Sequence, residues 1–133
     1  MTIIETPPPP AKRRRGSPEM KIQAECVKVA WNEFPETRFC LFHVANEVDR
    51  PASSPMIGAR RRAEGIVRGV SDLILLLPRK GYHALCIEMK TESGYQSSFQ
   101  KNWQSIVESN GYKYVICRSA DQFRQELKDY LGL

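Results

Sequence analysis

Residues 71–90 read SDLILLLPRKGYHALCIEMK, two apolar runs joined by a short segment of turn-forming residues. The first run, Ser71 to Leu77, is almost continuously apolar, as expected for a central strand buried on both faces. Pro78 to Gly81 predicts a turn, and His83 to Lys90 predicts the next strand. The segment therefore predicts a hairpin in which the start of one strand lies beside the end of the other.

Three charged residues lie within the two predicted strands of this hairpin: Asp72, Glu88 and Lys90. Strand side chains alternate between faces, so Glu88 and Lys90 point the same way and Met89 points the other way. The hairpin brings Asp72 close to both. Two carboxylates at one point suit Mg²⁺ or Mn²⁺, which can activate water at a phosphodiester, and a nearby lysine can orient that water. An ordinary ion pair at the strand ends, Glu88–Lys90 or Asp72–Lys90, explains the same spacing, so the spacing alone leaves both interpretations open.

Outside the hairpin, helical and extended patterns alternate along the chain. Ser17-Pro18 and Ser54-Pro55 each place a capping serine before a proline at the first helical position, which predicts two helix starts. The other predicted elements are a helix from Ser17 ended by Pro35, a strand from Arg38 to Val44, a helix from about Ile57 to Val67, a helix from Ser97 or Ser98 to Asn110, a strand from Tyr112 to Cys117 and a helix from Ala120 to Leu131. This order predicts a mixed α/β fold with helices on the faces of the sheet.

The composition is that of one soluble globular domain preceded by a polar arm. Of the 133 residues, 41% are hydrophobic and 26% are charged, and a chain of this length favours a single core. Residues 1–16 contain Pro7 to Pro10 and Lys12 to Arg15, which predicts a flexible Pro-rich and basic arm before a domain at residues 17–133. No apolar run approaches the roughly 20 residues that span a bilayer, and we expect neither a membrane segment nor a secretory signal.

Basic residues are concentrated in the arm and in one part of the domain. The arm's four basic residues against Glu5 account for +3 of the formal net charge of +5, which leaves +2 for the domain. Such clusters suit phosphate contacts, since each neutralised phosphate releases counterions, but a solvated basic face explains them equally well. The candidates for nucleic-acid contacts in the domain are Arg60, Arg61, Arg62, Arg68 and Lys101.

The four cysteines predict buried thiols rather than a metal cluster. Cys26, Cys40, Cys86 and Cys117 form no CxxC pair, and each lies in an apolar stretch. A structural zinc site needs closely spaced ligands, and the chain has only two histidines. We therefore expect reduced thiols and a cytoplasmic protein.

Three segments together resemble the VRR-NUC family of PD-(D/E)xK nucleases. They are GVSDLILLL, YHALCIEMKTESGYQSSFQKNW and GYKYVICRSADQ. The most specific pieces are G-x-x-D-L, I-E-x-K, and Gln100 followed three residues later by Trp103. The resemblance covers roughly residues 17 to 131 and implies a mixed-sheet, restriction-endonuclease-like core with flanking helices.

The resemblance also implies roles for individual residues of the hairpin. Asp72 and Glu88 would be metal ligands together with the backbone carbonyl of Met89, and Lys90 would be the catalytic lysine. The family usually has proline before the aspartate, whereas this chain has Ser71. Because proline would only stiffen the start of the strand, we expect this departure to have a modest effect on geometry.

Two residues outside the hairpin are implied in the same site. Gln100 would face the centre from the helix that follows, and Glu19 would reach in from the first helix. Glu19 with Gln23 matches the family's E-x-x-x-Q context, and Glu25 is the alternative if the register of that helix differs.

The function implied is Mg²⁺- or Mn²⁺-dependent hydrolysis of DNA, by in-line attack of water and without a covalent intermediate. Stand-alone members of the family resemble phage or bacterial proteins, so the resemblance places the chain in a bacterial cell or a phage-infected host. A homodimer would suit cleavage of branched DNA such as a Holliday junction. The resemblance implies no small-molecule cofactor. Two alternatives stay open: a nucleic-acid-binding module that keeps the fold without cutting, and a structural α/β domain with an ion-paired strand edge.

Overall fold

A computed structural model describes residues 17–45 and 54–133. The arm predicted at residues 1–16 lies outside them. The elements in chain order are α2 (Pro18–Glu33), the 3₁₀ helix η1 (Pro35–Thr37), β1 (Leu41–His43), α3 (Pro55–Ala63), β2 (Leu73–Leu75), β3 (Leu85–Met89), α4 (Ser98–Ser109), β4 (Lys113–Cys117) and α5 (Ala120–Leu131). Both predicted serine caps are present, since Ser17 accepts a hydrogen bond from the Met20 amide and Ser54 accepts one from the Ile57 amide.

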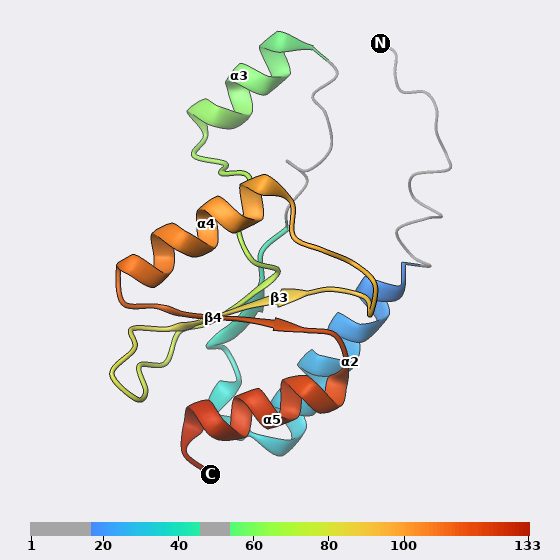
Figure 1. Cartoon of the computed structure of the whole chain (residues 1–133), viewed down its shortest axis with the longest axis vertical. Coiled ribbons are helices and arrows are strands. Elements are labelled where there is room, and N and C mark those ends of the chain that lie inside the picture. The colour runs from blue at the N-terminus through green and yellow to red at the C-terminus, as the bar shows by residue number, and fades with distance from the viewer. Residues whose placement is uncertain (1–16, 46–53) are drawn as a thin grey trace.

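The four strands form one mixed sheet in the order β1-β2-β3-β4. β1 and β2 pair antiparallel, and so do β2 and β3. β3 and β4 pair parallel, with α4 as the connection between them. α4 covers one face of the sheet, and α2 and α5 cover the other (Figure 1). The predicted hairpin and the mixed α/β architecture are therefore confirmed.

The main core lies between the sheet and the pair α2 and α5. Alternate residues of β3, namely Leu85, Ile87 and Met89, are almost completely buried on this side. They meet a set of equally buried side chains from the two helices, namely Cys26, Ala30, Phe123, Leu127 and Tyr130. The other residues of β3, including Glu88, therefore point toward α4.

Several helices and strands are shorter in the structure than the sequence predicts. The strand expected from Arg38 to Val44 is reduced to β1, because η1 and the positive φ of Phe39 (68°) interrupt the extended chain before it. The helix expected to reach Val67 ends at Ala63, and Gly65 with φ 87° follows it. The hairpin strands are shorter than predicted, at three residues in β2 and five in β3.

Gly69 brings the chain before β2 into main-chain contact with the first turn of α4. Its φ is 90°, and a Cβ built on it would lie 2.3 Å from the carbonyl oxygen of Phe99. A side chain at this position would overlap backbone that cannot move aside without shifting the helix. Only glycine fits, and this contact fixes where α4 begins relative to β2.

The four cysteines are free thiols. Cys26, Cys86 and Cys117 are buried, as predicted, whereas Cys40 is half-buried. Burial raises the pKa of the Cys26 thiol to about 12 and that of Cys86 to about 11, so both stay protonated. No helix within residues 17–45 and 54–133 is long and apolar enough to cross a membrane.

Candidate active site

The hairpin register places Asp72 beside Glu88. Leu73 pairs with Ile87 across the two antiparallel strands, so the next residues outward on the two strands are Asp72 and Glu88. The Met89 amide donates a hydrogen bond of 2.7 Å to Oδ2 of Asp72. The Asp72 carbonyl accepts one of 2.8 Å from the Val44 amide. Asp72 is thus held on both sides, by β3 and by the chain that follows β1.

Glu88 is a buried carboxyl group whose two oxygens both have partners. Its exposed fraction is 2%. Gln100 Nε2 donates to Oε2 at 2.9 Å, and Lys90 Nζ lies 3.7 Å from the same oxygen. The Tyr114 hydroxyl donates to Oε1 at 3.4 Å.

Burial, followed by the charge of Asp72 and a side-chain hydrogen bond with it, raises the pKa of Glu88 to about 9. Lys90 lowers the pKa of Glu88, but not enough to offset these effects. Without an additional cation, Glu88 is therefore mostly protonated at neutral pH. A buried acid beside a second acid is costly to ionise unless a positive charge is supplied.

Gln100 is fixed by the start of α4. Its Oε1 accepts a hydrogen bond of 2.8 Å from the Ser97 amide, and the Ser97 hydroxyl accepts one of 3.2 Å from the Gln100 amide. This reciprocal capping box holds one end of the Gln100 side chain. The other end, Nε2, is thereby aimed at Glu88.

Lys90 follows β3 directly and is 9% exposed. Its amide donates to the Cys117 carbonyl at 3.1 Å, which continues the pairing with β4. Arg118 then holds the turn after Lys90, since its Nη1 donates to the carbonyls of Thr91 at 2.6 Å and Gly94 at 2.8 Å. Sequence patterns gave no signal for this use of Arg118, which joins two loops 24 or more residues apart.

Sequence reasoning also missed Tyr114 and Gln96. Gln96 Nε2 donates to the Tyr114 hydroxyl at 3.2 Å and to Gln104 Oε1 at 2.8 Å. Tyr114 in turn donates to Glu88, so polar side chains of α4 and its preceding loop connect to Glu88 through one hydroxyl. The parallel register that sets Tyr114 opposite Cys86, and so on the Glu88 face, is not encoded in any local pattern.

The sequence model of the VRR-NUC domain matches residues 17–121. The chain belongs to the VRR-NUC family. A solved structure described as a VRR_NUC domain protein superimposes with a TM-score of 0.71 over 86% of this chain and 88% of that chain, at 22% sequence identity, which supports the fold. No curated protein sequence matches the chain. VRR-NUC proteins are nucleases, and nucleases of this type generally use a divalent metal.

The VRR-NUC hairpin of this chain fits a hard divalent cation by its donor chemistry. Asp72 and Glu88 offer carboxylate oxygens, which Mg²⁺ and Mn²⁺ prefer, and a cation beside them would favour the ionised form of Glu88 and so lower its raised pKa. Within the described ranges, no group of three or more Asp, Glu, His or Cys side chains gathers at one point. A cation here would therefore rely on these two carboxylates, on main-chain oxygen and on water, as Mg²⁺ often does.

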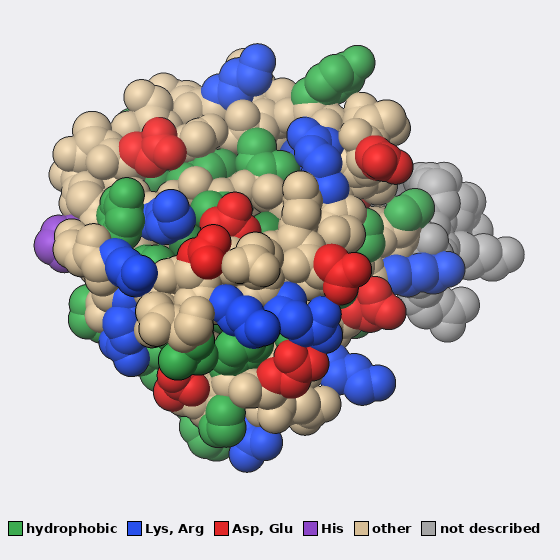
Figure 2. Space-filling view, turned by 60° about the horizontal axis from the view of Figure 1, so that its bottom comes forward, with side chains coloured by type: hydrophobic (Ala, Val, Ile, Leu, Met, Phe, Trp, Pro, Cys, Tyr) green, Lys and Arg blue, Asp and Glu red, His purple; other side chains and the backbone are tan. Residues whose placement is uncertain are grey.

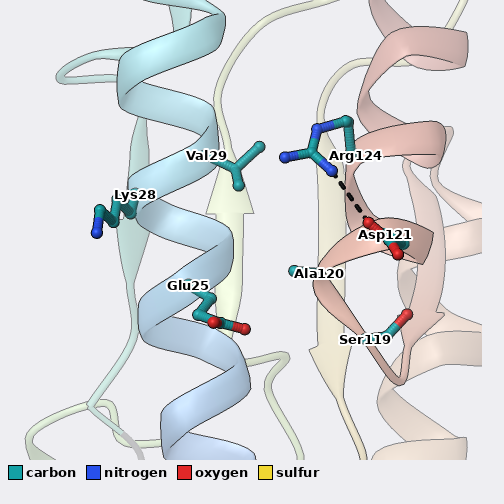
Figure 3. Close-up of a pocket in the computed structure, with 7 residues that line it drawn as sticks. All are labelled: Glu25, Lys28, Val29, Ser119, Ala120, Asp121 and Arg124. Atoms are coloured by element: carbon teal, nitrogen blue, oxygen red, sulfur yellow. Dashed lines mark hydrogen bonds and ion pairs between the residues drawn. The ribbon is translucent and has the colours of Figure 1, made fainter.

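The two candidates on the first helix lie in different surroundings. Glu19, in the first turn of α2, is near enough for its charge to raise the pKa of Glu88, but it does not join the acidic pair in a three-residue cluster. Glu25 instead lines a surface pocket of about 450 Å³ between α2 and α5, together with Ser119 and Arg124 (Figure 3). That pocket contains none of the hairpin residues, so of the two glutamates it is Glu19 whose charge acts on the hairpin.

The candidate basic residues lie on the α3 and α4 side of the molecule. Arg60, Arg61 and Arg62 occupy the last turn of α3, which Figure 1 places beyond α4 and away from α5. Lys101 is exposed on α4, and the Arg68 guanidinium lies over the ring of Phe99. By contrast, the face seen in Figure 2 intermixes Lys and Arg with Asp and Glu side chains. That face is therefore not a continuous positive surface.

Proposed function

We propose that this VRR-NUC protein is a Mg²⁺- or Mn²⁺-dependent DNA endonuclease. The observation that carries the proposal is the buried Glu88 carboxyl beside Asp72, with Lys90 as its one ion-pair partner among residues 17–45 and 54–133. A divalent cation would supply the positive charge that this arrangement needs. Asp72, Glu88 and the Met89 carbonyl would hold the cation, which supplies Lewis-acid stabilisation at the scissile phosphate. Glu19 is assigned a supporting role through its charge.

The other residues of the centre orient the Glu88 carboxyl group or balance charge on the substrate. Gln100 and Tyr114 hold the two Glu88 oxygens in one orientation. Lys90 orients the attacking water and offsets negative charge that builds on the phosphate. Water attacks the phosphorus in line, the bond to the leaving sugar oxygen breaks, and no covalent enzyme intermediate forms.

We further propose a homodimer acting on branched DNA such as a Holliday junction. The hairpin provides one centre in each chain, so two chains would let both strands of a junction be cut within one complex. Arg60, Arg61, Arg62, Arg68 and Lys101 would contact the phosphates, and the basic arm at residues 1–16 would extend that contact from the domain at 17–133. The activity would take place in the cytoplasm of a bacterial cell or a phage-infected host.

The test is cleavage of a labelled panel of four-way junction, 5′ flap, linear duplex and single strand, each with Mg²⁺, Mn²⁺ or EDTA. Wild type is compared with Lys90→Ala and with Lys128→Ala, a matched loss of an exposed lysine on α5. We expect metal-dependent cutting by wild type and Lys128→Ala, and DNA binding without cutting by Lys90→Ala. Binding without cutting by all three proteins would instead establish a non-catalytic nucleic-acid module, and cutting of flaps but not junctions would remove the junction proposal.

A further inference from the structure

Arg68 and Phe99 form an exposed cation–π pair. The guanidinium carbon of Arg68 lies 3.8 Å from the centre of the Phe99 ring. The Phe99 side chain is 44% exposed, and Arg68 is exposed as well. Neither group belongs to the core, and the pair leaves part of an aromatic ring and a planar cation available to a ligand at the surface.

Main-chain contacts hold this pair in place. Gly69, next to Arg68, approaches the Phe99 backbone so closely that a Cβ would lie 2.3 Å from the Phe99 carbonyl oxygen and 3.0 Å from the Gln100 nitrogen. The capping box at Ser97 fixes the same turn of α4. The two backbones that carry the pair are therefore held close together, which reduces the ordering that binding would otherwise require.

The pair is also adjacent to the catalytic centre. Phe99 precedes Gln100, whose side-chain Nε2 donates to Oε2 of Glu88 at 2.9 Å. A ligand that stacked on Phe99 would thus be one residue along α4 from a side chain that holds a metal-binding carboxylate. Arg68 would add positive charge where the substrate backbone passes.

A nucleobase matches these faces. Bases stack on aromatic rings and on arginine guanidinium planes, but a base inside a continuous duplex is already covered above and below by its neighbours. Away from the ends of a duplex, only an unpaired base can present a free face to a platform of this kind. The geometry points to Arg68 and Phe99 as a stacking platform for one unpaired nucleobase beside the scissile phosphate.

This inference rests on the proposed nuclease function and adds a substrate feature to it. The centre would act next to an unpaired nucleotide, as found at a bulge, a flap or an open junction, rather than on continuous duplex. Discrimination would then come from the local absence of pairing, and no particular base sequence would be needed, because every base has a flat face.

The experiment measures binding without cleavage. A short dye-labelled duplex with one unpaired adenine at its centre is compared with the same duplex fully paired, by fluorescence anisotropy in EDTA at one fixed salt concentration. The proteins are wild type, Phe99→Leu, Arg68→Lys and the control Trp31→Leu. Trp31 is an equally exposed aromatic (43%) at the opposite end of α2 from Glu19. Thermal midpoints verify that each variant is folded.

Wild type should bind the unpaired duplex at least about fivefold more tightly than the paired one, the lower limit for stacking one base on an aromatic side chain. Phe99→Leu should abolish this preference while leaving affinity for paired duplex unchanged. Arg68→Lys, which keeps the charge and loses the plane, should reduce the preference, and Trp31→Leu should preserve it.

Equal affinity of wild type for both duplexes, or an undiminished preference in Phe99→Leu, would overturn the platform while leaving the nuclease proposal intact. A Phe99-dependent preference in a protein that cuts no DNA with either metal would support the platform and overturn the nuclease proposal. Loss of all DNA binding at low salt in wild type would reject both.

Discussion

Replacing Glu88 with glutamine removes the ionisable group at the centre of the candidate site while keeping its shape. Glu88 is 2% exposed, and its pKa is raised from 4.5 to about 9 by burial and then by Asp72. The folded protein therefore holds a proton on Glu88 that the unfolded chain releases between these two pH values. Because the folded state binds more protons in this window, the free energy of unfolding falls as pH rises from about 4.5 to about 9.

The size of this effect follows from the pKa shift. Each pH unit inside the window removes about 1.4 kcal/mol of unfolding free energy. Between pH 4.5 and pH 8, the loss attributable to Glu88 is on the order of 5 kcal/mol. Glutamine resembles the protonated acid and has no proton to lose. Glu88→Gln should therefore match wild type near pH 4.5 and exceed it by about 5 kcal/mol at pH 8.

Urea denaturation at a series of pH values in EDTA measures this difference, with far-ultraviolet circular dichroism as the probe. Glu108→Gln, which changes an exposed glutamate on α4, is the matched control and should follow wild type throughout. If the unfolding free energies of Glu88→Gln and wild type differed by a constant amount at every pH, Glu88 would ionise normally in the fold, and the electrostatic argument for a cation site would be refuted.

Three further predictions concern metal binding, the Tyr114 hydroxyl and the contact of Gly69 with α4. Mn²⁺ should raise the thermal midpoint of wild type at pH 8 but not that of Glu88→Gln, because only a ligand bound to the folded state stabilises it; equal shifts in differential scanning fluorimetry would contradict this. Tyr114→Phe should weaken Mn²⁺ binding about tenfold in calorimetry, since it removes the donor to Glu88 Oε1, and unchanged affinity would show that the hydroxyl does not orient the ligand. Gly69→Ala should lower the free energy of unfolding by more than about 3 kcal/mol, because positive-φ strain adds to overlap with the Phe99 backbone. The control is Gly65→Ala, at a position with φ 87° and open space around it, which should lower the free energy of unfolding by only about 1 kcal/mol. Equal losses in the two variants would reject the overlap.

The sequence was informative wherever a short-range rule determined the structure. Capping serines marked the starts of α2, α3 and α4, and strand alternation with a short turn brought Asp72 and Glu88 together. The predicted strand at residues 38–44 was too long because Phe39 has a left-handed backbone conformation that ends the extended chain. Phenylalanine rarely adopts this conformation, so the sequence does not mark the position.

What the sequence did not reveal depends on distant segments. Tyr114 reaches Glu88 across 26 residues, and Arg118 reaches Gly94 across 24. Both contacts follow from the parallel pairing of β3 with β4, whose register is set by how α4 crosses the sheet rather than by either strand alone. Gly69 was visible as part of a motif, but its steric role required knowing that α4 begins directly against it.

Gln100 performs two tasks with the two ends of one amide, and this limits how its position can change. The oxygen end caps α4, and the nitrogen end holds Glu88. Glutamate in its place would keep the cap but bring another negative charge against Glu88, and asparagine, which is shorter by one methylene, would give up the reach that both contacts need. In a mutational scan, loss of fitness at this position would therefore combine a folding defect with an active-site defect. By the same reasoning, a glutamine at the corresponding position of a relative is not by itself a sign that the relative cuts DNA, because the helix alone is sufficient reason to keep it.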